Sequence, residues 1–410
     1  SLINERSLRQ TEVIREINSK WGNEVILSGP ILKVPYEHTS EERIFDEQAK
    51  AYRTETNTSI KYAYLFPDTL DIASNVASKP LNRSIYESVV YTADISVQGT
   101  FPKIALSEKD IKPDAILWDK ITVLVRSSNL KGIRSAPAVQ LHSQSLSLTP
   151  KYDREYLNTL ESEPIQNLSM ETTTDLAFSF DLTINGSESL RFIPIGKETT
   201  ASMTSNWHSP SFDGNYLPID DTKEISANGF KASWQVLQIN RQYEQVFYGK
   251  LPNLTEFAFG TNLIIPVDEY QKSERSAKYG FMVIGLTLLV FLLIQLVSKI
   301  YIHPFQYVMI GLALVMFYTL LISISEHSSF LKAYIIAGGS VLLLITVYSR
   351  AILKGFKFPL LVCASLASLY GFIYVIIQLE NYALLVGSIG LFVILAIIMF
   401  ASRRIDWGND

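Results

Sequence analysis

One short stretch of this sequence combines aromatic rings with polar groups, a mixture that can recognise a ligand. The stretch TSNWHSPSF occupies positions 204–212, and its candidate residues are Asn206, Trp207, His208, Pro210 and Phe212. The rings of Trp207 and Phe212 supply contact area, while the amide of Asn206 or the imidazole of His208 supplies directional hydrogen bonds. A loop that packs against a β-sheet through its rings is the favoured interpretation, and a surface for a partner or ligand is the alternative.

A second stretch, Ser325-Glu326-His327, places two ionisable groups at the end of a long apolar segment. Ionisable groups near the hydrocarbon of a membrane are costly unless they are hydrated or paired, so they are candidates for function. A capping or interface-anchoring role is the favoured interpretation. The alternative is that Glu326 and His327 couple the membrane helices to the domain outside.

Signatures of catalysis are absent from the chain. The sequence contains no GxxxxGK[ST] phosphate loop, HExxH helix, GxSxG elbow or CxxC pair. Its five histidines lack the spacing of metal ligands, and the carboxylate pairs Asp220-Asp221 and Glu41-Glu42 lie in hydrophilic stretches typical of solvated turns. We therefore expect no catalytic residue, no metal and no cofactor, and an enzyme is not the first expectation.

The elements that must position these clusters include a membrane bundle. Five windows lack Asp, Glu, Lys and Arg: Gly280–Ser298, Pro304–Ser325, Ala333–Ser349, Phe358–Leu379 and Asn381–Ser402. As helices they would be roughly 25–33 Å long, which matches the hydrocarbon core of a bilayer. Residues 279–410 are therefore predicted to form a five-helix, multi-pass transmembrane bundle.

The loops between these windows indicate the orientation of the bundle. Six basic residues lie on one side, namely Lys299, Arg350, Lys354, Lys357, Arg403 and Arg404, and Lys332 lies on the other. Because basic loops stay in the cytoplasm, the C-terminus is predicted to be cytoplasmic and residues 1–278 to lie outside. A domain exported in this way needs a signal or anchor helix, so we expect a further span upstream of Ser1.

The outer part of the chain has a different periodicity. Residues 2–21 have the loose apolar stripe of an amphipathic helix, ended by Gly22, which would follow the expected upstream span. Residues 88–101 then alternate apolar and polar side chains, as a half-buried strand does. Similar signals recur at Ile121–Val125, Leu176–Ile184, Leu190–Ile195, Phe230–Ile239 and Leu263–Val267. Residues 23–278 are thus predicted to be a mostly antiparallel, sandwich-like β domain.

Three local expectations complete this organisation. Asn185-Gly186 is predicted to form the turn of a β-hairpin, because both residues accept a positive φ. Residues 40–59 and 129–175 are polar and are predicted to be insertions or long loops. In the fourth and fifth spans, Ala364 with Ser368, Ala367 with Gly371, and Ala383 with Gly387 have the spacing of small residues that allows helices to pack closely.

The charge of the chain limits the classes of partner that we expect, and its cysteine content limits disulfide formation. The residues before position 279 contain 29 Lys and Arg against 36 Asp and Glu, so the outer domain is acidic. An acidic surface is a poor fit to nucleic acid or to anionic lipid headgroups, and membrane lipid is expected around the bundle only. The single Cys363 lies in a predicted span, so no intrachain disulfide can form.

Several of these residues also carry a resemblance to a known family. The quoted stretches are Trp21-Gly22, Gly29–Tyr36, Ser205-Asn206-Trp207, Pro210-Ser211-Phe212, Arg275–Tyr279, His303-Pro304, Gln306-Tyr307, Ser325-Glu326-His327 and Ile405-Asp406-Trp407. In this order, from the first residues to the last, they resemble the CreD family of bacterial inner-membrane proteins. The residues His303, Pro304, Gln306 and Tyr307 form a motif on the predicted cytoplasmic face.

The resemblance implies a cell-envelope integrity protein with one N-terminal span, a large periplasmic domain and a C-terminal bundle. It also implies a link to envelope-stress regulation and to altered tolerance of antibiotics and colicins. The family has no established biochemical activity, so no catalytic residue is transferred from it.

Two functions from different classes follow from these observations. The first is a non-enzymatic envelope protein whose β domain binds a protein or glycan partner, while the bundle anchors it and joins a larger membrane complex. The second is a membrane enzyme or transporter for a lipid-linked or amphiphilic envelope substrate, with a site near Glu326, His327, Trp207 and His208. A cavity between helices lined by those groups would favour the second function.

Overall fold

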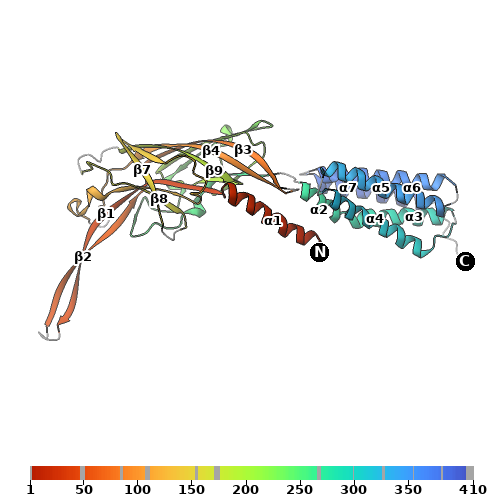
Figure 1. Cartoon of the computed structure of the whole chain (residues 1–410), viewed down its shortest axis with the longest axis horizontal. Helices are drawn as coiled ribbons and strands as arrows, with labels where there is room; N and C mark the ends of the chain where they lie inside the picture. The colour runs from red at the N-terminus through yellow and green to blue at the C-terminus, as the bar shows by residue number, and fades with distance from the viewer. Residues whose placement is uncertain are drawn as a thin grey trace. The chain divides into compact units, whose positions relative to one another are not determined.

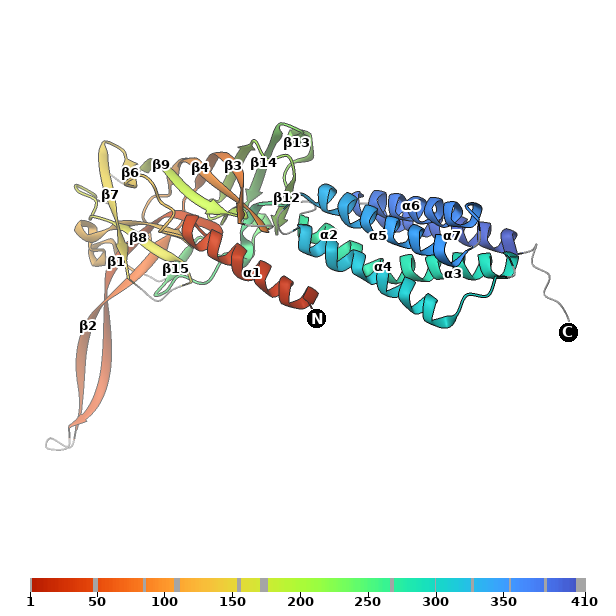
Figure 2. The same cartoon turned by 45° about the vertical axis from the view of Figure 1, so that its right-hand side comes forward.

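The chain divides into two compact units. The computed structural model describes residues 2–46, 51–83, 86–106, 111–152, 156–169, 176–265, 269–298, 300–325, 328–353, 355–379 and 382–402. A β unit comprises Ile14–Leu81 and Ser88–Ile264, and a helical unit comprises Ile265–Asp410 with Ser1–Val13 and Asn82–Glu87. Figures 1 and 2 show the elements of each unit.

The β unit is one long sheet that folds back on itself. Its strands are β1 (Val25–Asp46), β2 (Ala51–Leu65), β3 (Thr69–Arg83), β4 (Tyr86–Phe101), β5 (Thr122–Ser127), β6 (Ala138–Leu141), β7 (Gln144–Lys151), β8 (Asn158–Ser162), β9 (Leu176–Ser187), β10 (Ser189–Phe192), β11 (Glu198–Ser205), β12 (Pro210–Gly214), β13 (Glu224–Ser226), β14 (Gly229–Leu237), β15 (Val246–Tyr248) and β16 (Phe259–Leu263). Short 3₁₀ turns occur at Pro113–Ala115, Trp118–Lys120, Asp220–Thr222, Gln238–Asn240 and Thr255–Phe257.

The order of strands shows how the sheet closes. Hydrogen-bonded neighbours run β12-β16-β10-β1-β5-β8-β7-β6-β9-β4-β3-β11-β14-β13, and β2 pairs with β1 and β15. The ring of Phe212 in β12 lies 5.8 Å from the ring of Trp234 in β14, although these strands are near opposite ends of that order. The two ends therefore face each other across an apolar core. Most ladders are antiparallel, while β1 with β10 and β3 with β11 are parallel.

The alternation that predicts a strand at residues 88–101 is confirmed by β4. Along this strand Val89, Tyr91, Ile95, Val97 and Phe101 are buried, because alternate side chains of a strand point to the same face. The same alternation places polar side chains of β3, β9 and β11 on the opposite face. The prediction of a large β-rich domain is confirmed.

The prediction of a hairpin at Asn185-Gly186 is wrong. Both residues lie inside β9, where they pair with Thr92 and Tyr91 of β4. A Cβ atom at Gly186 would lie 2.3 Å from the hydroxyl oxygen of Tyr91, so the glycine is required for close approach of the buried ring. The chain changes direction two residues later, at Glu188, whose φ is 62°.

Residues 40–59 are predicted to be an insertion or a long loop, and the loop is wrong for the described residues 40–46 and 51–59. These belong to a long hairpin in which β1 pairs with β2 from Leu32↔Leu65 out to Asp46↔Ala51. The hairpin projects from the body of the β unit as an arm (Figure 1). Its described side chains beyond Glu37 are largely exposed, so it lacks the apolar alternation by which a strand is recognised.

Two other predicted boundaries differ from the structure. The region 129–175, expected to be loop or insertion, contains β6, β7 and β8. The strand predicted at Leu263–Val267 overlaps β16 only at Leu263, where β16 ends; Ile264 and Ile265 are outside any strand, and residues 266 and 267 fall outside the described residues.

The amphipathic pattern of residues 2–21 is confirmed as helix α1 (Leu2–Trp21). Its C-terminal end is fixed to the β unit by directional contacts. The indole N–H of Trp21 donates to the carbonyl of Tyr91 at 3.1 Å, and the hydroxyl of Ser88 donates to the side-chain oxygen of Asn18 at 2.6 Å.

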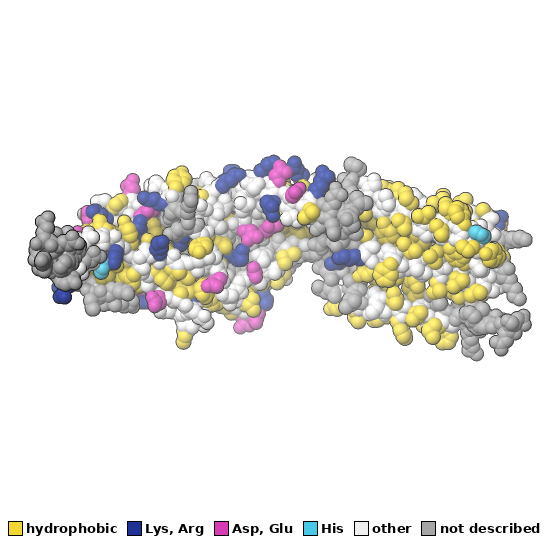
Figure 3. Space-filling model, turned by 90° about the horizontal axis from the view of Figure 1, so that it is seen from below, with side chains coloured by type: hydrophobic (Ala, Val, Ile, Leu, Met, Phe, Trp, Pro, Cys, Tyr) yellow, Lys and Arg dark blue, Asp and Glu magenta, His cyan; other side chains and the backbone are white. Residues whose placement is uncertain are grey.

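The helical unit contains α2 (Glu269–Lys278), α3 (Gly280–Ser298), α4 (Pro304–Ser325), α5 (Phe330–Ile352), α6 (Lys357–Gln378) and α7 (Ala383–Ser402). Within the described residues, α3 to α6 are the four helices long and apolar enough to span a membrane. The fifth predicted span corresponds to α7, in which a shorter apolar helix, Leu385–Ile397, is recognised. Hydrophobic side chains cover most of the visible face of these helices in Figure 3.

The bundle packs around aromatic residues. The ring of Phe317 in α4 lies 4.6 Å from that of Tyr370 in α6, and the hydroxyl of Tyr334 in α5 donates to the carbonyl of Tyr370 at 2.8 Å. Arg275 of α2 donates to the carbonyl of Leu379, which follows the last turn of α6, at 3.0 Å. A cation at this end of a helix interacts favourably with the helix dipole.

The predicted small-residue contact between α6 and α7 is wrong for α6. Ala364, Ala367 and Ser368 are exposed, and nothing lies within 4 Å of a Cβ built on Gly371. The close approach involves Gly390 of α7 instead, because a Cβ there would lie 2.0 Å from the ring of Phe372. A large residue facing a small one thus joins the two helices.

Candidate functional site

The loop that follows β11 bonds two of its candidate residues to the β unit, although Asn206 is exposed and only Trp207 is buried. The side-chain oxygen of Asn206 accepts from the backbone N–H of Ser78 at 2.7 Å, and its amide donates to the carbonyl of Ser78 at 2.9 Å. The side chain thereby continues the ladder between β3 and β11. Trp207 is 7% exposed, and its indole N–H donates to the carbonyl of Ile264 at 3.0 Å.

The other candidates of this loop differ in exposure. Phe212 is half-buried, and its ring packs edge-on against Phe230 and Trp234, both at 5.8 Å. Pro210 is half-buried at the start of β12. His208 is exposed, with its ring 5.3 Å from that of Trp207. The rings of the loop hold it to the β unit, and His208 remains available to a partner.

A hollow on the outer face of the sheet is a second candidate site, which the sequence analysis did not identify. This polar trough has a volume of about 460 Å³ and is lined by residues of four neighbouring strands, β9, β4, β3 and β11. Its polar lining residues are Ser74, Asn75, Asp94, Ser96, Asp181, Thr183, Ser202 and Thr204. The signal that could have located it is the polar half of the alternation in each strand.

The trough is acidic and its polar groups are ordered. Thr183 donates to Asp94 at 2.7 Å, Ser96 donates to Asp181, and Thr204 donates to the side-chain oxygen of Asn75 at 3.2 Å. None of the lining residues is basic. Each carboxylate has two oxygens and further lone pairs, so these bonds leave acceptors for a ligand.

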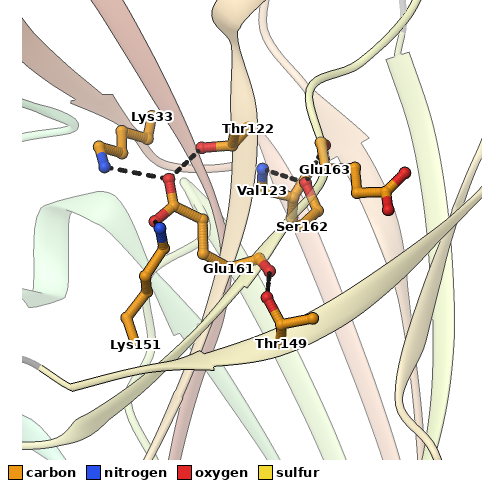
Figure 4. A network of polar contacts seen from close by, with 8 residues as sticks. All are labelled: Lys33, Thr122, Val123, Thr149, Lys151, Glu161, Ser162 and Glu163. Atoms are coloured by element: carbon orange, nitrogen blue, oxygen red, sulfur yellow. Dashed lines mark hydrogen bonds and ion pairs between the residues drawn. The ribbon is translucent and has the colours of Figure 1, made fainter.

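Glu161 forms the centre of a partly buried charged network (Figure 4). Its carboxylate accepts from Lys33 at 3.0 Å and from Thr122 at 2.8 Å, and it lies 3.4 Å from the ammonium of Lys151. Burial alone raises the pKa of Glu161, but the hydrogen bonds from Lys33 and Thr122 and the charges of both lysines lower it overall. A carboxylate held ionised in this way is unsuited to the role of general acid, and it joins β1, β5, β7 and β8.

The remaining predicted residues are Glu326, His327 and the motif that begins at His303. Glu326 and His327 fall outside the described residues, so their predicted coupling role stays a prediction. His303 precedes α4: its ring Nδ1 accepts from the backbone N–H of Phe305 at 3.2 Å, while the side-chain oxygen of Gln306 accepts from the backbone N–H of His303 at 3.0 Å.

This reciprocal pair caps the N-terminus of α4, with Pro304 at the first helical position. Tyr307 joins two helices, because its hydroxyl donates to Gln295 of α3 at 2.9 Å. The motif of His303, Pro304, Gln306 and Tyr307 therefore has a structural explanation. Among the residues that the structure describes, no group of three or more His, Cys, Asp or Glu side chains could hold a metal ion.

Comparison with known proteins agrees with these features. The model of the family described as "Inner membrane protein CreD" matches residues 1–408. The inner membrane protein CreD of Escherichia coli (strain K12) is 29% identical over 408 residues, which cover 99% of this chain and 88% of that protein. With its four membrane-length apolar helices, the chain is a multi-pass inner-membrane protein of the cell envelope. The match over nearly the whole sequence means that this chain belongs to the CreD family.

Proposed function

We propose that this protein is a non-enzymatic envelope integrity protein whose β unit lies in the periplasm and binds a glycan through the polar trough. The charges of the helix-connecting loops support this orientation, since six basic residues lie on the side assigned to the cytoplasm and one on the other. The C-terminus is then cytoplasmic, and α7 is the fifth span.

The observation that carries the proposal is the shape and chemistry of the trough. Short side chains, Ala73, Ser96 and Ser202, are part of its lining, which leaves space above the sheet. Hydroxyls of a sugar donate to carboxylates such as Asp94 and Asp181 and accept from donors such as the amide of Asn75 and the hydroxyl of Ser202. Asn206 and the exposed His208 follow Thr204 along the same chain and would extend the binding surface beyond the trough.

The composition of the trough favours a glycan over a protein. The centres of protein interfaces are enriched in aromatic residues, Met and Arg, and none of these lines the trough. Its carboxylates would also repel an acidic polysaccharide. The favoured ligand is therefore an uncharged stretch of glycan.

The test is binding of neutral N-acetylglucosamine oligosaccharides to the full chain in lipid nanodiscs, measured by titration calorimetry. Ser202→Tyr places a large ring in the trough and is expected to weaken binding at least about tenfold, since it displaces the ligand from several hydrogen bonds. The matched control is Gln235→Tyr, on the outer face of β14 and outside the trough, which should leave binding unchanged. Equal binding by both variants, or preference for an acidic polysaccharide or a polypeptide, would refute the proposal.

Membership of a larger membrane complex is the second part of the proposal. Purification of the full chain from native membranes in mild detergent should recover a protein partner at constant stoichiometry. Recovery of the chain alone would contradict it. Of the residues proposed for the alternative of an enzyme or transporter, Trp207 is engaged in the core of the β unit, while Glu326 and His327 fall outside the described residues, so this alternative stays a prediction.

A further inference from the structure

The helical unit contains a cavity that none of the predicted sites uses. Its volume is about 450 Å³, and it lies among α3, α6 and α7. Thr287, Val362 and Leu366 are buried at its base. Val393 and Ile397 line it from α7, yet their side chains are 48% and 62% exposed, so the cavity opens on the outer surface of the bundle.

The packing of α7 explains why the cavity is there. Gly390 accommodates the ring of Phe372, and a Cβ at Gly387 would lie 3.8 Å from Ile376. These two contacts join α7 to α6 near the start of α7. Beyond Gly390, the lining residues of α7 are Val393, Ile394 and Ile397, and Ile394 also packs against the core of the bundle.

The position of the opening determines what can enter. The helices α3 and α6 are of membrane length, and Val393 and Ile397 lie within the apolar stretch Leu385–Ile397. The opening therefore faces hydrocarbon. The lining is mostly apolar, with the hydroxyls of Thr287, Ser365 and Ser368 as its polar side-chain groups, so hydrocarbon suits the cavity better than water does.

We infer that the cavity is a binding site for one acyl chain of a membrane phospholipid, which enters beside α7. A methylene group occupies about 30 Å³, close to the volume per water molecule in the liquid. The cavity therefore holds roughly 15 methylene groups. This is the size of a single acyl chain. A transmembrane helix of another protein is about 10 Å wide and does not fit a space of this volume.

Thr287 distinguishes a hydrocarbon occupant from a polar one. Its side chain is 4% exposed, and its hydroxyl oxygen has no hydrogen-bond partner among the described residues. A ligand with a polar group at this depth would bond to that hydroxyl. An acyl chain makes no such bond, so Thr287→Val, which keeps the shape of the side chain, should leave its binding intact.

The test uses the full chain in nanodiscs that contain a phosphatidylethanolamine with a photoreactive diazirine in one acyl chain. After irradiation, mass spectrometry locates the label. We expect label on Thr287, Val362 or Leu366, which annular lipid cannot reach, as well as on the exposed Phe281. Ser365→Trp, which fills the cavity, should lower labelling of the buried residues at least about fivefold and spare Phe281.

Two further variants keep the result interpretable. Ala364→Trp places the same side chain on the exposed surface of α6 and should leave all labelling unchanged. If Ser365→Trp unfolds the bundle, Val393→Trp blocks the opening instead. Absence of label on the buried residues of the wild type, unchanged labelling in the filled variants, or loss of labelling in Thr287→Val would each overturn the inference. None of these outcomes bears on glycan binding by the β unit.

Discussion

Lys33 and Glu161 are 128 positions apart in the sequence and meet through a hydrogen bond of 3.0 Å that joins β1 to β8. The side chain of Glu161 is 10% exposed and that of Lys33 is 23% exposed, so the pair is largely shielded from water. A pair in this setting contributes little more than apolar residues would, yet removing one member leaves the other charge uncompensated. The main effect of breaking the pair is therefore the free-energy cost of the unpaired charge that remains.

We expect Glu161→Gln to lower the free energy of unfolding of the β unit by about 2–3 kcal/mol. This is less than the loss for a fully buried pair, because the ammonium of Lys33 can still reach water. Lys151→Ala is the control. The side chain of Lys151 is 56% exposed, so its loss should change the same quantity by about 0–1 kcal/mol. Urea unfolding followed by tryptophan fluorescence measures both, and equal effects would contradict a special role for Glu161.

Two buried carboxylates should give opposite dependences on pH. The folded-state pKa of Glu161 is lowered, so its contribution to stability is present above its ordinary pKa and is lost as pH falls through the folded value. Burial is the largest cause of a raised pKa at Glu188. A hydrogen bond from Asn18 lowers this pKa, and the charge of Glu24 raises it. Its contribution is present at low pH and is lost as pH rises through the folded value.

The measurement is the difference in free energy of unfolding between wild type and variant from about pH 4 to about pH 8. The loss of stability caused by Glu161→Gln should shrink toward acid pH. Glu188→Gln should stabilise the protein more at neutral than at acid pH. Parallel curves for Glu161→Gln and Glu188→Gln would show that the two environments do not differ as described.

The arm formed by β1 and β2 should be dispensable for folding. Beyond Glu37↔Ile60, its ladder partners come from the arm itself. Replacement of residues 38–59 by a two-residue Asn-Gly turn should therefore change the free energy of unfolding by less than about 1 kcal/mol. Leu65→Ala at the base of β2, where Leu65 is 1% exposed, should lower it by about 2–5 kcal/mol. A large loss on removing the arm would mean that it contacts the body in solution.

How far the sequence predicts this fold depends on whether burial leaves a periodic signal. The strand β4 and the apolar helices α3 to α6 were predictable, because each is buried on one face or surrounded by lipid along its whole length. The described side chains of the β1–β2 arm beyond Glu37 are largely exposed and polar, so their pattern does not distinguish this segment from a loop. Asn185-Gly186 has the composition of a turn, but the space beside Tyr91 decides its conformation.

The candidate sites show the same limit. Trp207 and Phe212 were recognisable as packing residues, since large rings beside a strand are usually buried. The polar trough depends on Asp94, Asp181 and Ser202, which are far apart in sequence and become neighbours only through the pairing of β9, β4, β3 and β11. Sequence alone does not specify that order of strands.

The contact between α6 and α7 gives a prediction with a matched control. Gly390→Ala should destabilise the bundle by about 1–3 kcal/mol, because the added Cβ would lie 2.0 Å from the ring of Phe372, which must move. Gly387→Ala adds the same atom at an ordinary contact distance of 3.8 Å from Ile376 and should be neutral. Thermal unfolding in detergent measures both variants. A greater effect at Gly387 would place the helix contact elsewhere.

The loop after β11 allows stability and partner binding to be tested separately. Trp207→Ala removes a buried ring and leaves the carbonyl of Ile264 without its donor, so the free energy of unfolding should fall by about 3–5 kcal/mol. Any envelope defect of this variant would reflect lost folding. His208→Ala removes an exposed ring and should change stability by no more than about 0.5 kcal/mol.

These two variants are compared by abundance in the membrane, thermal stability and sensitivity of cells to envelope stress. If the loop contributes to a partner surface, His208→Ala should impair the envelope phenotype at normal abundance and stability. If the loop only packs, His208→Ala should behave as wild type while Trp207→Ala loses abundance and phenotype together. The second result would mean that a partner binds to other surfaces of the β unit, because His208 carries the exposed ring of this loop.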